Sequence, residues 1–401
     1  MKLTLLLLLS PLFSFAQQGN GDYTARIFYD VEEALQTPKE VFKLHLDHSQ
    51  LAKISPNIVK FQNLRDLQLG GNPDLDWDKT FELLAQLPNL EKLSLSENDL
   101  EVLPATIRQM SALEELVLVG NPQLNWWVTF SHLAALPNLS KLDIGNNKIK
   151  DLPPNIGQMM ALRELLVWGN RLINLPPDIG ELQDLVELDL SNNRLRRLTS
   201  TVKHLKKLRK LYLWNNRLTE LPTEIGKLKS LQILHLGGNN LTTLPTSIQQ
   251  LKQLNNLGLA YNNLLHFPDK FYKLSNLKNL DLEGNPKMNW LTVFTKPNKF
   301  NNLRVVNLIN NNLIDLPPNI DALQQLQVLD IKQNPMMNWK SVFVQLSQLS
   351  SLKQLDVSNN NIQQFPSEIQ LLDALTFLNI ANNPTLDWGS TFPVLAKMNR
   401  L

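Results

Sequence analysis

The chain has 401 residues, of which 43% are hydrophobic, so it is long enough for two or three ordinary domains or for one long repeat array. Its net charge of +2 argues against a general nucleic-acid-binding protein. The chain has no cysteine, which excludes disulfides, thiolate metal sites and a cysteine nucleophile.

The first residues have the pattern of a secretory signal peptide. Lys2 supplies a positive charge, residues 3–13 form an apolar run, and the run ends at a Ser14-Phe15-Ala16 cleavage site. We predict that residues 1–16 are removed and that the mature chain is exported to a periplasm, the cell surface or the medium. The alternative is a retained N-terminal anchor. The run is short for a membrane span, and no later segment is apolar enough to cross a bilayer.

Residues 17–40 are predicted to form an N-terminal capping segment. The stretch from Tyr29 to Leu35 has the pattern of a short amphipathic helix, with Asp30 as its N-cap. Such a helix would cover the open core of the domain that follows.

One frame recurs through residues 41–401, as in Leu208-x-x-Leu211-x-Leu213-x-x-Asn216-x-Leu218. Fifteen units fit it, ten of 23 residues and five of 26. The units begin at Val41, Leu64, Leu90, Leu113, Leu139, Leu162, Leu185, Leu208, Leu231, Leu254, Leu277, Leu303, Leu326, Leu352 and Leu375. A fixed period of this length indicates a solenoid, in which each unit is too small to hold a core alone and must stack on its neighbours.

The positions of the frame have separate roles. The Leu-x-Leu alternation buries one face of a short strand. The asparagine at offset 8 from the first leucine is present in fourteen units, from Asn72 to Asn383, and Ser49 is the exception. We predict that these asparagines are structural, because an amide at the end of the strand can bond backbone groups that would otherwise be buried unpaired.

The five 26-residue units carry a Trp-x-x-x-Phe motif after the strand. A spacing of four places both rings on one helical face. We predict longer helices with larger core residues here, rather than five aromatic binding sites. The pairs are Trp77/Phe81, Trp126/Phe130, Trp290/Phe294, Trp339/Phe343 and Trp388/Phe392.

The frame resembles the leucine-rich repeat family over about nine-tenths of the chain. Most 23-residue units continue with Leu-Pro-x-x-Ile-x-x-Leu, as in Leu221-Pro222-Thr223-Glu224-Ile225 with Leu228, which is similar to the Ras-scaffold and Scribble-like subclass and to bacterial relatives. The resemblance implies an α/β solenoid of about fifteen repeats, a horseshoe with a parallel sheet on its concave face and short 3-10 or α segments on its convex face. It also implies partner binding more often than catalysis.

Offsets 2, 4, 6 and 7 project from the concave sheet or its exit, so function can be encoded there without disturbing the core. Large aromatic side chains and arginines gather at such free positions and at offset 9 in repeats six to ten. We predict that a partner binds there. The predicted site residues are Leu166, Trp168, Arg171, Asp189, Arg194, Tyr212, Trp214, Arg217, His235 and Tyr261. Aromatic residues with arginine are the composition of interface hot spots.

A narrower hypothesis concerns Trp168 and Trp214, which lie two repeats apart at offset 6 with Ser191 between them. Strands spaced about 4.8 Å apart would separate the two indoles by about 10 Å. The pair would then form a slot for one planar group, such as a sugar ring, a proline or an aromatic side chain.

Residues 194–229 contain eleven Lys or Arg and two acidic residues. An anionic surface polymer is one partner that this excess would suit, and the alternative is a solvated convex face. Nucleic acid is not expected, because an exported protein seldom meets it.

No catalytic arrangement is evident, and we predict a protein that is not an enzyme and uses no cofactor or metal. His45-Leu46-Asp47-His48 holds three side chains of the kinds that bind zinc, but no further ligand is identifiable. The sequence stops at Leu401, where a sixteenth repeat would begin, and no polar cap is evident. We expect the last unit to close the core itself in a monomer; the alternative is a dimer through that end.

These observations predict an exported, non-catalytic protein that binds a protein or peptide through its concave face. The first alternative is a glycan-binding module that uses the Trp168/Trp214 slot. The second is a structural envelope protein without a discrete ligand.

Overall fold

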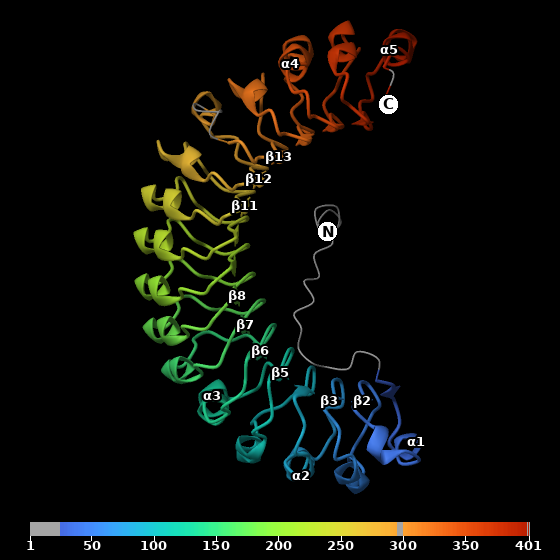
Figure 1. The fold of residues 1–401 in the computed structure, drawn as a ribbon, viewed down its shortest axis with the longest axis vertical. Coiled ribbons are helices and arrows are strands. Elements are labelled where there is room, and N and C mark those ends of the chain that lie inside the picture. Colours follow the sequence, from blue (N-terminus) through green and yellow to red (C-terminus); the bar gives the residue numbers. More distant parts are fainter. Residues whose placement is uncertain (1–24, 295–299, 399, 401) are drawn as a thin grey trace.

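The computed structural model describes residues 25–294, 300–398 and 400, and the predicted signal peptide lies outside them. The described residues form one parallel sheet of sixteen strands, arranged in chain order along the concave side of a horseshoe (Figure 1). The strands are β1 (Ile27–Phe28), β2 (Lys43–His45), β3 (Asp66–Gln68), β4 (Lys92–Ser94), β5 (Glu115–Val117), β6 (Lys141–Asp143), β7 (Glu164–Leu166), β8 (Glu187–Asp189), β9 (Lys210–Tyr212), β10 (Ile233–His235), β11 (Asn256–Gly258), β12 (Asn279–Asp281), β13 (Val305–Asn307), β14 (Val328–Asp330), β15 (Gln354–Asp356) and β16 (Phe377–Asn379).

Short helices cover the convex side. The α-helices are α1 (Val31–Ala34), α2 (Trp77–Leu84), α3 (Trp126–Leu133), α4 (Trp339–Leu346) and α5 (Trp388–Leu395). The 3-10 helices are η1 (Pro38–Glu40), η2 (Pro56–Lys60), η3 (Ala105–Gln109), η4 (Pro154–Gln158), η5 (Pro177–Glu181), η6 (Ser200–His204), η7 (Thr223–Lys227), η8 (Thr246–Gln250), η9 (Phe271–Lys273), η10 (Trp290–Thr292), η12 (Ile320–Ala322) and η13 (Ser367–Leu371). This arrangement confirms the predicted α/β solenoid with an open horseshoe sheet.

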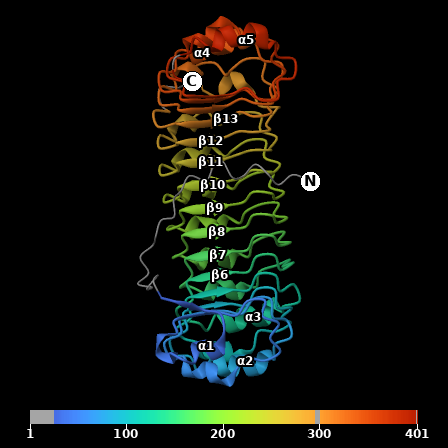
Figure 2. The same cartoon turned by 90° about the vertical axis from the view of Figure 1, so that its right-hand side faces the viewer.

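Each strand from β2 to β16 occupies offsets 2 to 4 of one repeat, and neighbouring strands pair with equivalent residues side by side. Offsets 0, 3 and 5 are buried, as Leu208, Leu211 and Leu213 show with at most 1% of their surface exposed. Figure 2, which views the sheet side of the horseshoe, shows the strands stacked as a ladder. Side chains at one offset therefore form continuous rows across the repeats.

The asparagine ladder is buried and bonded to the backbone. Asn216 Nδ2 donates to Leu190 O at 2.9 Å and to Leu213 O at 3.1 Å, and its Oδ1 accepts from the N–H of Leu195 at 2.9 Å. Leu190 and Leu195 belong to the preceding repeat. Each ladder asparagine thus completes the repeat before its own, which explains why Ser49, in the first repeat, needs no amide.

The residue before each ladder position has a left-handed backbone conformation in every repeat. Glycine or asparagine holds most of these positions, because both tolerate a positive φ. The residues are His48, Gly71, Glu97, Gly120, Asn146, Gly169, Asn192, Asn215, Gly238, Tyr261, Gly284, Asn310, Gln333, Asn359 and Asn382. Tyr261, with φ of 51°, is the one bulky aromatic residue among them.

The N-terminal segment caps the first repeat. β1 pairs in parallel with β2, and Phe28 and Ala34 are buried against the first repeat. The Asp30 side chain accepts from the N–H of Glu33 at 2.8 Å at the start of α1, as the sequence indicates.

The Trp-x-x-x-Phe units form α2, α3, α4 and α5, and the fifth such unit begins with η10. Phe81, Phe130 and Phe343 are fully buried on the core side of their helices. The four α-helices begin at Asp or Asn N-caps that the sequence analysis did not single out. Phe81, Phe130 and Phe343 are therefore core residues.

The aromatic pair of the last described repeat is more exposed than its counterparts, and closure of the core by that repeat stays a prediction. Phe392, whose counterpart Phe343 is fully buried, is 62% exposed, and Trp388 is 49% exposed. The physical reason is that each repeat's core is completed by the next, and no described repeat follows α5. None of the described helices is long and apolar enough to cross a membrane.

Candidate functional site

Four of the predicted site residues lie in one row of the concave sheet, at offset 4 of their repeats. Register pairs Leu166 with Asp189, Asp189 with Tyr212, and Tyr212 with His235, so four predicted site residues are consecutive neighbours. All four side chains are half-buried. Gly258 is the next residue of this row after His235. Because Gly258 has no side chain, nothing at that position covers the His235 ring from the side.

Tyr212 and His235 form the centre of this row. Their rings meet edge to face, with centroids 5.3 Å apart and planes at 73°. Burial raises the pKa of the Tyr212 hydroxyl to about 12, and the charges of Glu187 and Asp189 add to the effect. Burial also lowers the pKa of His235, whose Nε2 lies 3.2 Å from Asn256 Oδ1. Both rings are therefore neutral at physiological pH, and the pair is an apolar platform with polar edges.

Trp168 lies flat against the preceding repeat. Its indole covers Gly145 so closely that a Cβ atom at Gly145 would overlap the ring. Burial raises the pKa of the neighbouring Asp143, and the nearby indole opposes this shift in part. The Trp168 indole thus packs on Gly145, and its side chain is half-buried.

Trp214 follows Ser191 by one repeat at the same offset, as Trp168 follows Gly145. Ser191 is fully buried, and its hydroxyl has no hydrogen-bond partner among the described residues. Ser191 therefore offers no accessible surface between the two indoles, and the slot for one planar group stays a prediction.

Tyr261 lies at the far end of the cluster. It leaves the sheet at the left-handed position, and its ring packs on the next repeat, where a Cβ atom at Gly284 would be 2.7 Å from the ring. Its hydroxyl donates to the Glu283 carboxylate. The ring remains 55% exposed. A bulky side chain held at a positive φ is conformationally strained, which is a feature that concentrates at functional positions.

The arginines lie beyond the strands, at offset 9. Arg194 and Arg217 are exposed, and Arg171 is half-buried. Among the described residues none makes a hydrogen bond or ion pair with any of their guanidinium groups. They lie along the edge of the sheet beside Trp168 and Trp214, so the aromatic rings adjoin a line of guanidinium groups that have no ion-pair partner among the described residues.

In repeats three to eight the concave row at offset 2 is occupied by charges paired with a neighbouring strand. Lys141 Nζ lies 2.6 Å from Glu115, and Lys210 Nζ lies 2.8 Å from Glu187. Opposite charges on neighbouring strands hold each other and leave little for a ligand. Neither these ion pairs nor the packing of Trp168 on Gly145 was predicted from the sequence. The signal for the packing was the small residue one repeat before each tryptophan.

Apart from Lys210 on β9, and Arg194 and Arg217 beside the sheet, the basic residues of 194–229 lie away from the concave rows. Lys206 and Lys229 occupy the same position in the loops that lead into successive strands, and Lys252 continues the series. The pKa of Lys229 is lowered by burial and by repulsion from Lys227, Lys206 and Lys252. Lys207 is paired with Asp184 at 2.7 Å. Much of the positive excess thus lies along one edge of the horseshoe, where exposed lysines without an ion pair in the described part of the chain are free to meet an anion.

Comparison with known proteins identifies the repeat. A model for a leucine-rich repeat region matches residues 198–296, a leucine-rich repeat model matches residues 160–218, and another matches residues 138–159 and 351–372. A search of curated protein sequences gave no significant match.

Solved structures agree. A leucine-rich repeat protein of Leptospira interrogans is similar over 94% of this chain and 98% of that one, with 30% identity and a TM-score of 0.81. A TLR13–ssRNA13 complex is 24% identical over 82% of this chain and 52% of that chain, with a TM-score of 0.67. The plant peptide hormone receptor RGFR1 in complex with RGF2 is 21% identical over 86% of this chain and 67% of that chain, with a TM-score of 0.54. The last two likenesses, both below 25% identity, show a shared fold.

Proposed function

The chain belongs to the leucine-rich repeat family, and from this premise we propose that it is a non-catalytic protein that binds a protein or peptide through the concave face of repeats six to ten. The observation that carries the proposal is the aromatic cluster of Trp168, Tyr212 and Trp214 beside the unpaired Arg194 and Arg217. We further propose that the mature chain acts after export, at an envelope or outside the cell.

Large side chains of this cluster are already held in place before a partner binds. Trp168 is held by its seat on Gly145, and Tyr212 by its contact with His235. Rings that are ordered before binding lose little entropy on contact, so their apolar area contributes to affinity nearly in full. Arg194 and Arg217 add donors that suit backbone carbonyls and carboxylates of a peptide.

The residues of the concave rows favour a polypeptide ligand over a nucleic acid or a glycan. Asp143 and Asp189 lie in the offset-4 row on both sides of Leu166, and carboxylates there would repel the phosphates of a nucleic acid. A sugar ring seated between the two indoles would need an accessible residue between them, and Ser191 is fully buried. A peptide needs only half-buried aromatic rings beside edge donors, and this face has both.

The test compares three immobilised forms of the mature chain: the natural sequence, Trp168→Ala/Trp214→Ala and Trp127→Ala. Trp127 is 61% exposed on the helical side, so its removal is a matched control for losing an exposed indole. Each form is used to select from a displayed peptide library and to capture proteins from an extract of the source cells.

We expect peptides or a protein that bind the natural chain and Trp127→Ala alike and that bind the double variant at least about 30-fold more weakly, since two hot-spot residues are lost. Equal binding by all three forms would exclude the concave cluster. Tryptophan fluorescence that changes with small sugars would favour a glycan. Capture that disappears at modest salt would favour the lysine edge and an anionic polymer.

A further inference from the structure

Positive charge gathers on one edge of the solenoid, where the chain enters β9, β10, β11 and β12. The segments that lead into these strands are residues 203–209, 226–232, 249–255 and 272–278. Together they contain nine Lys or Arg and no Asp or Glu. The four strands pair in register, so the segments are neighbours and their charges lie on one side of the molecule.

Lysine side chains form a row along this edge. We give the name lysine edge to five exposed residues: Lys206, Lys227, Lys229, Lys252 and Lys273. Lys229 Nζ donates to Gln250 Oε1 at 3.0 Å, and Lys252 Nζ donates to Lys273 O at 2.7 Å, so each lysine leans onto the next repeat. Within the described residues, no carboxylate forms an ion pair with any of the five.

The ammonium groups of the lysine edge repel one another. Burial, with the charges of Lys227, Lys206 and Lys252, lowers the pKa of Lys229. Burial and the charge of Lys273 lower the pKa of Lys252. The oxygens that accept from these lysines are neutral and do not cancel the repulsion. An anion at this edge would therefore relieve the repulsion in addition to its own attraction for each lysine.

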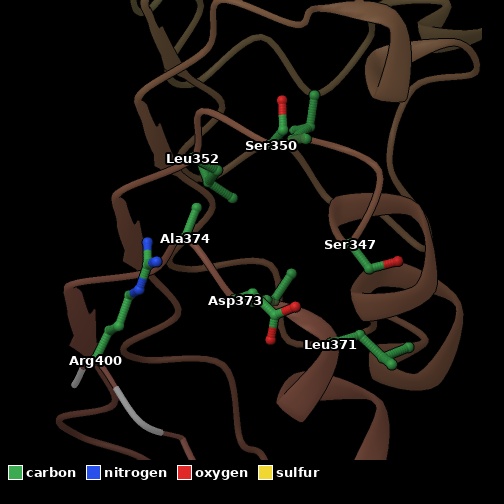
Figure 3. Close-up of a pocket in the computed structure, with 9 residues that line it drawn as sticks. Ser347, Ser350, Leu352, Leu371, Asp373, Ala374 and Arg400 are labelled. Atoms are coloured by element: carbon green, nitrogen blue, oxygen red, sulfur yellow. The ribbon is translucent and has the colours of Figure 1, made fainter.

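The fold does not require lysine on this edge. In the first fourteen repeats, the residue two places before the next repeat is lysine only at 206, 229 and 252. It is neutral in ten repeats and is Asp373 in the fourteenth. Asp373 and Ser350, which hold this position in neighbouring repeats, line a hollow of about 270 Å³ (Figure 3). Three lysines in consecutive repeats are thus a local feature that the core does not dictate, and such positions are free to serve binding.

From this one-sided charge we propose that the lysine edge binds an anionic membrane surface through the phosphate groups of its lipids. Lysine presents a hydrated point charge on a flexible stem, which suits many headgroups without selecting one. The opposite edge differs, because Arg194 and Arg217 lie there beside aromatic rings and suit a specific partner. Figure 2 shows the loops of successive repeats stacked in line beside the strands, so a planar surface can meet the whole row at once.

Contact through the lysine edge leaves the concave face open. The lysine edge precedes the strands, whereas Trp168 and Trp214 follow them, and Arg194 and Arg217 lie farther beyond. A chain held at a membrane by one edge would therefore turn the arginine side away from the lipid. Membrane binding and partner binding then use separate surfaces and can occur together.

The test is co-sedimentation of the mature chain with lipid vesicles. We expect binding to vesicles of equal parts phosphatidylglycerol and phosphatidylcholine, and none to phosphatidylcholine alone. Binding should disappear at about 1 M salt, where the Debye length is about 3 Å. Lys206→Gln/Lys229→Gln/Lys252→Gln should bind roughly 100-fold more weakly, because each lysine near an anionic membrane contributes roughly fivefold.

The matched control is Lys53→Gln/Lys150→Gln/Lys287→Gln, which removes three exposed lysines from the opposite side of the repeats. It changes the net charge by the same amount and should weaken binding less than about threefold. All six lysines are exposed, so circular dichroism should show an unchanged fold in both variants. Trp168→Ala/Trp214→Ala should bind the vesicles as the natural chain does, which separates this surface from the concave cluster.

Single cysteines report which edge meets the lipid, because the chain has no cysteine of its own. Ser275→Cys continues the row after Lys252, and Thr242→Cys lies on the opposite edge; both positions are exposed. An environment-sensitive dye should change its fluorescence with vesicles at the first position and not at the second. Equal binding by the two lysine variants, or a dye response at Thr242→Cys alone, would overturn the proposal. Binding to soluble polyphosphate without binding to the anionic vesicles would also overturn it, in favour of a soluble polymer.

Discussion

Replacing Asp281 with asparagine should stabilise the chain at neutral and alkaline pH. Asp281 lies on the concave row and accepts from the N–H of Glu283 at 3.2 Å. In the next repeat, Asn307 makes the same bond to the N–H of Ile309 at 3.0 Å, so the fold already accepts asparagine at this position. The substitution therefore keeps the hydrogen bond and removes only the charge.

The magnitude follows from the pKa of Asp281. Burial, with the nearby charge of Glu283, raises this pKa from the ordinary 3.8 to about 6. A raised pKa means that the folded chain holds the proton more tightly than the unfolded chain. The resulting stability is present below about pH 3.8 and is lost as the pH rises through about 6. The full difference corresponds to roughly 3 kcal/mol, and partial solvation reduces it to about 1–3 kcal/mol.

The assay is urea unfolding of the natural chain and Asp281→Asn at pH 8 and at pH 4. We expect the variant to gain about 1–3 kcal/mol at pH 8 and close to nothing at pH 4. Asp330→Asn is the comparison, because burial also raises the pKa of Asp330 to about 6 but Lys332 Nζ lies 3.1 Å from its carboxylate. Because this pKa already includes the attraction of Lys332, we expect a gain of similar size. An equal gain at both pH values, or a loss at pH 8, would refute the reasoning.

Three further substitutions test the ladder, the strained tyrosine and the tryptophan seat. Asn216→Leu should lower the free energy of unfolding by about 3 kcal/mol, because buried backbone groups of two repeats lose their partner, and urea unfolding measures this. Tyr261→Asn should raise it by about 1 kcal/mol, since asparagine tolerates the positive φ, while partner capture becomes weaker; a stability loss would argue against strain. Gly145→Ala should displace the indole of Trp168, change its fluorescence and weaken capture, whereas Gly237→Ala, at the same offset with no aromatic ring over it, should do neither. Unchanged fluorescence in the first of these variants would mean that the ring is not seated as described.

Much of the fold follows from the sequence because one pattern is repeated fifteen times. A leucine at offset 0, 3 or 5 meets its equivalent in the next repeat, so local preference and long-range packing point to the same structure. Asp30 was identifiable as an N-cap for the same reason, since capping depends only on residues three apart. The glycines and asparagines at offset 7 were an available signal for the left-handed turn that the sequence analysis did not use.

The candidate site was only partly predictable. Its rows follow from the register, but the direction of Trp168 depends on Gly145, which lies in a different repeat. The repeat period shows which residues share a face of the sheet, but it does not show how their aromatic rings are oriented. Phe392 illustrates a second limit, because the motif that buries Phe343 leaves Phe392 exposed where no described repeat follows. Burial in a solenoid is a property of neighbours and not of a motif.

The asparagine ladder gives the chain a direction in time as well as in space. Asn216 completes the repeat that began at Leu185, so a repeat is fully bonded only after the next one has been made. A chain that emerges from a ribosome, or that passes end-first through an export channel, therefore always carries one incomplete turn at its growing end. Completion trails synthesis by about one repeat, and structure is added in the order in which the residues arrive.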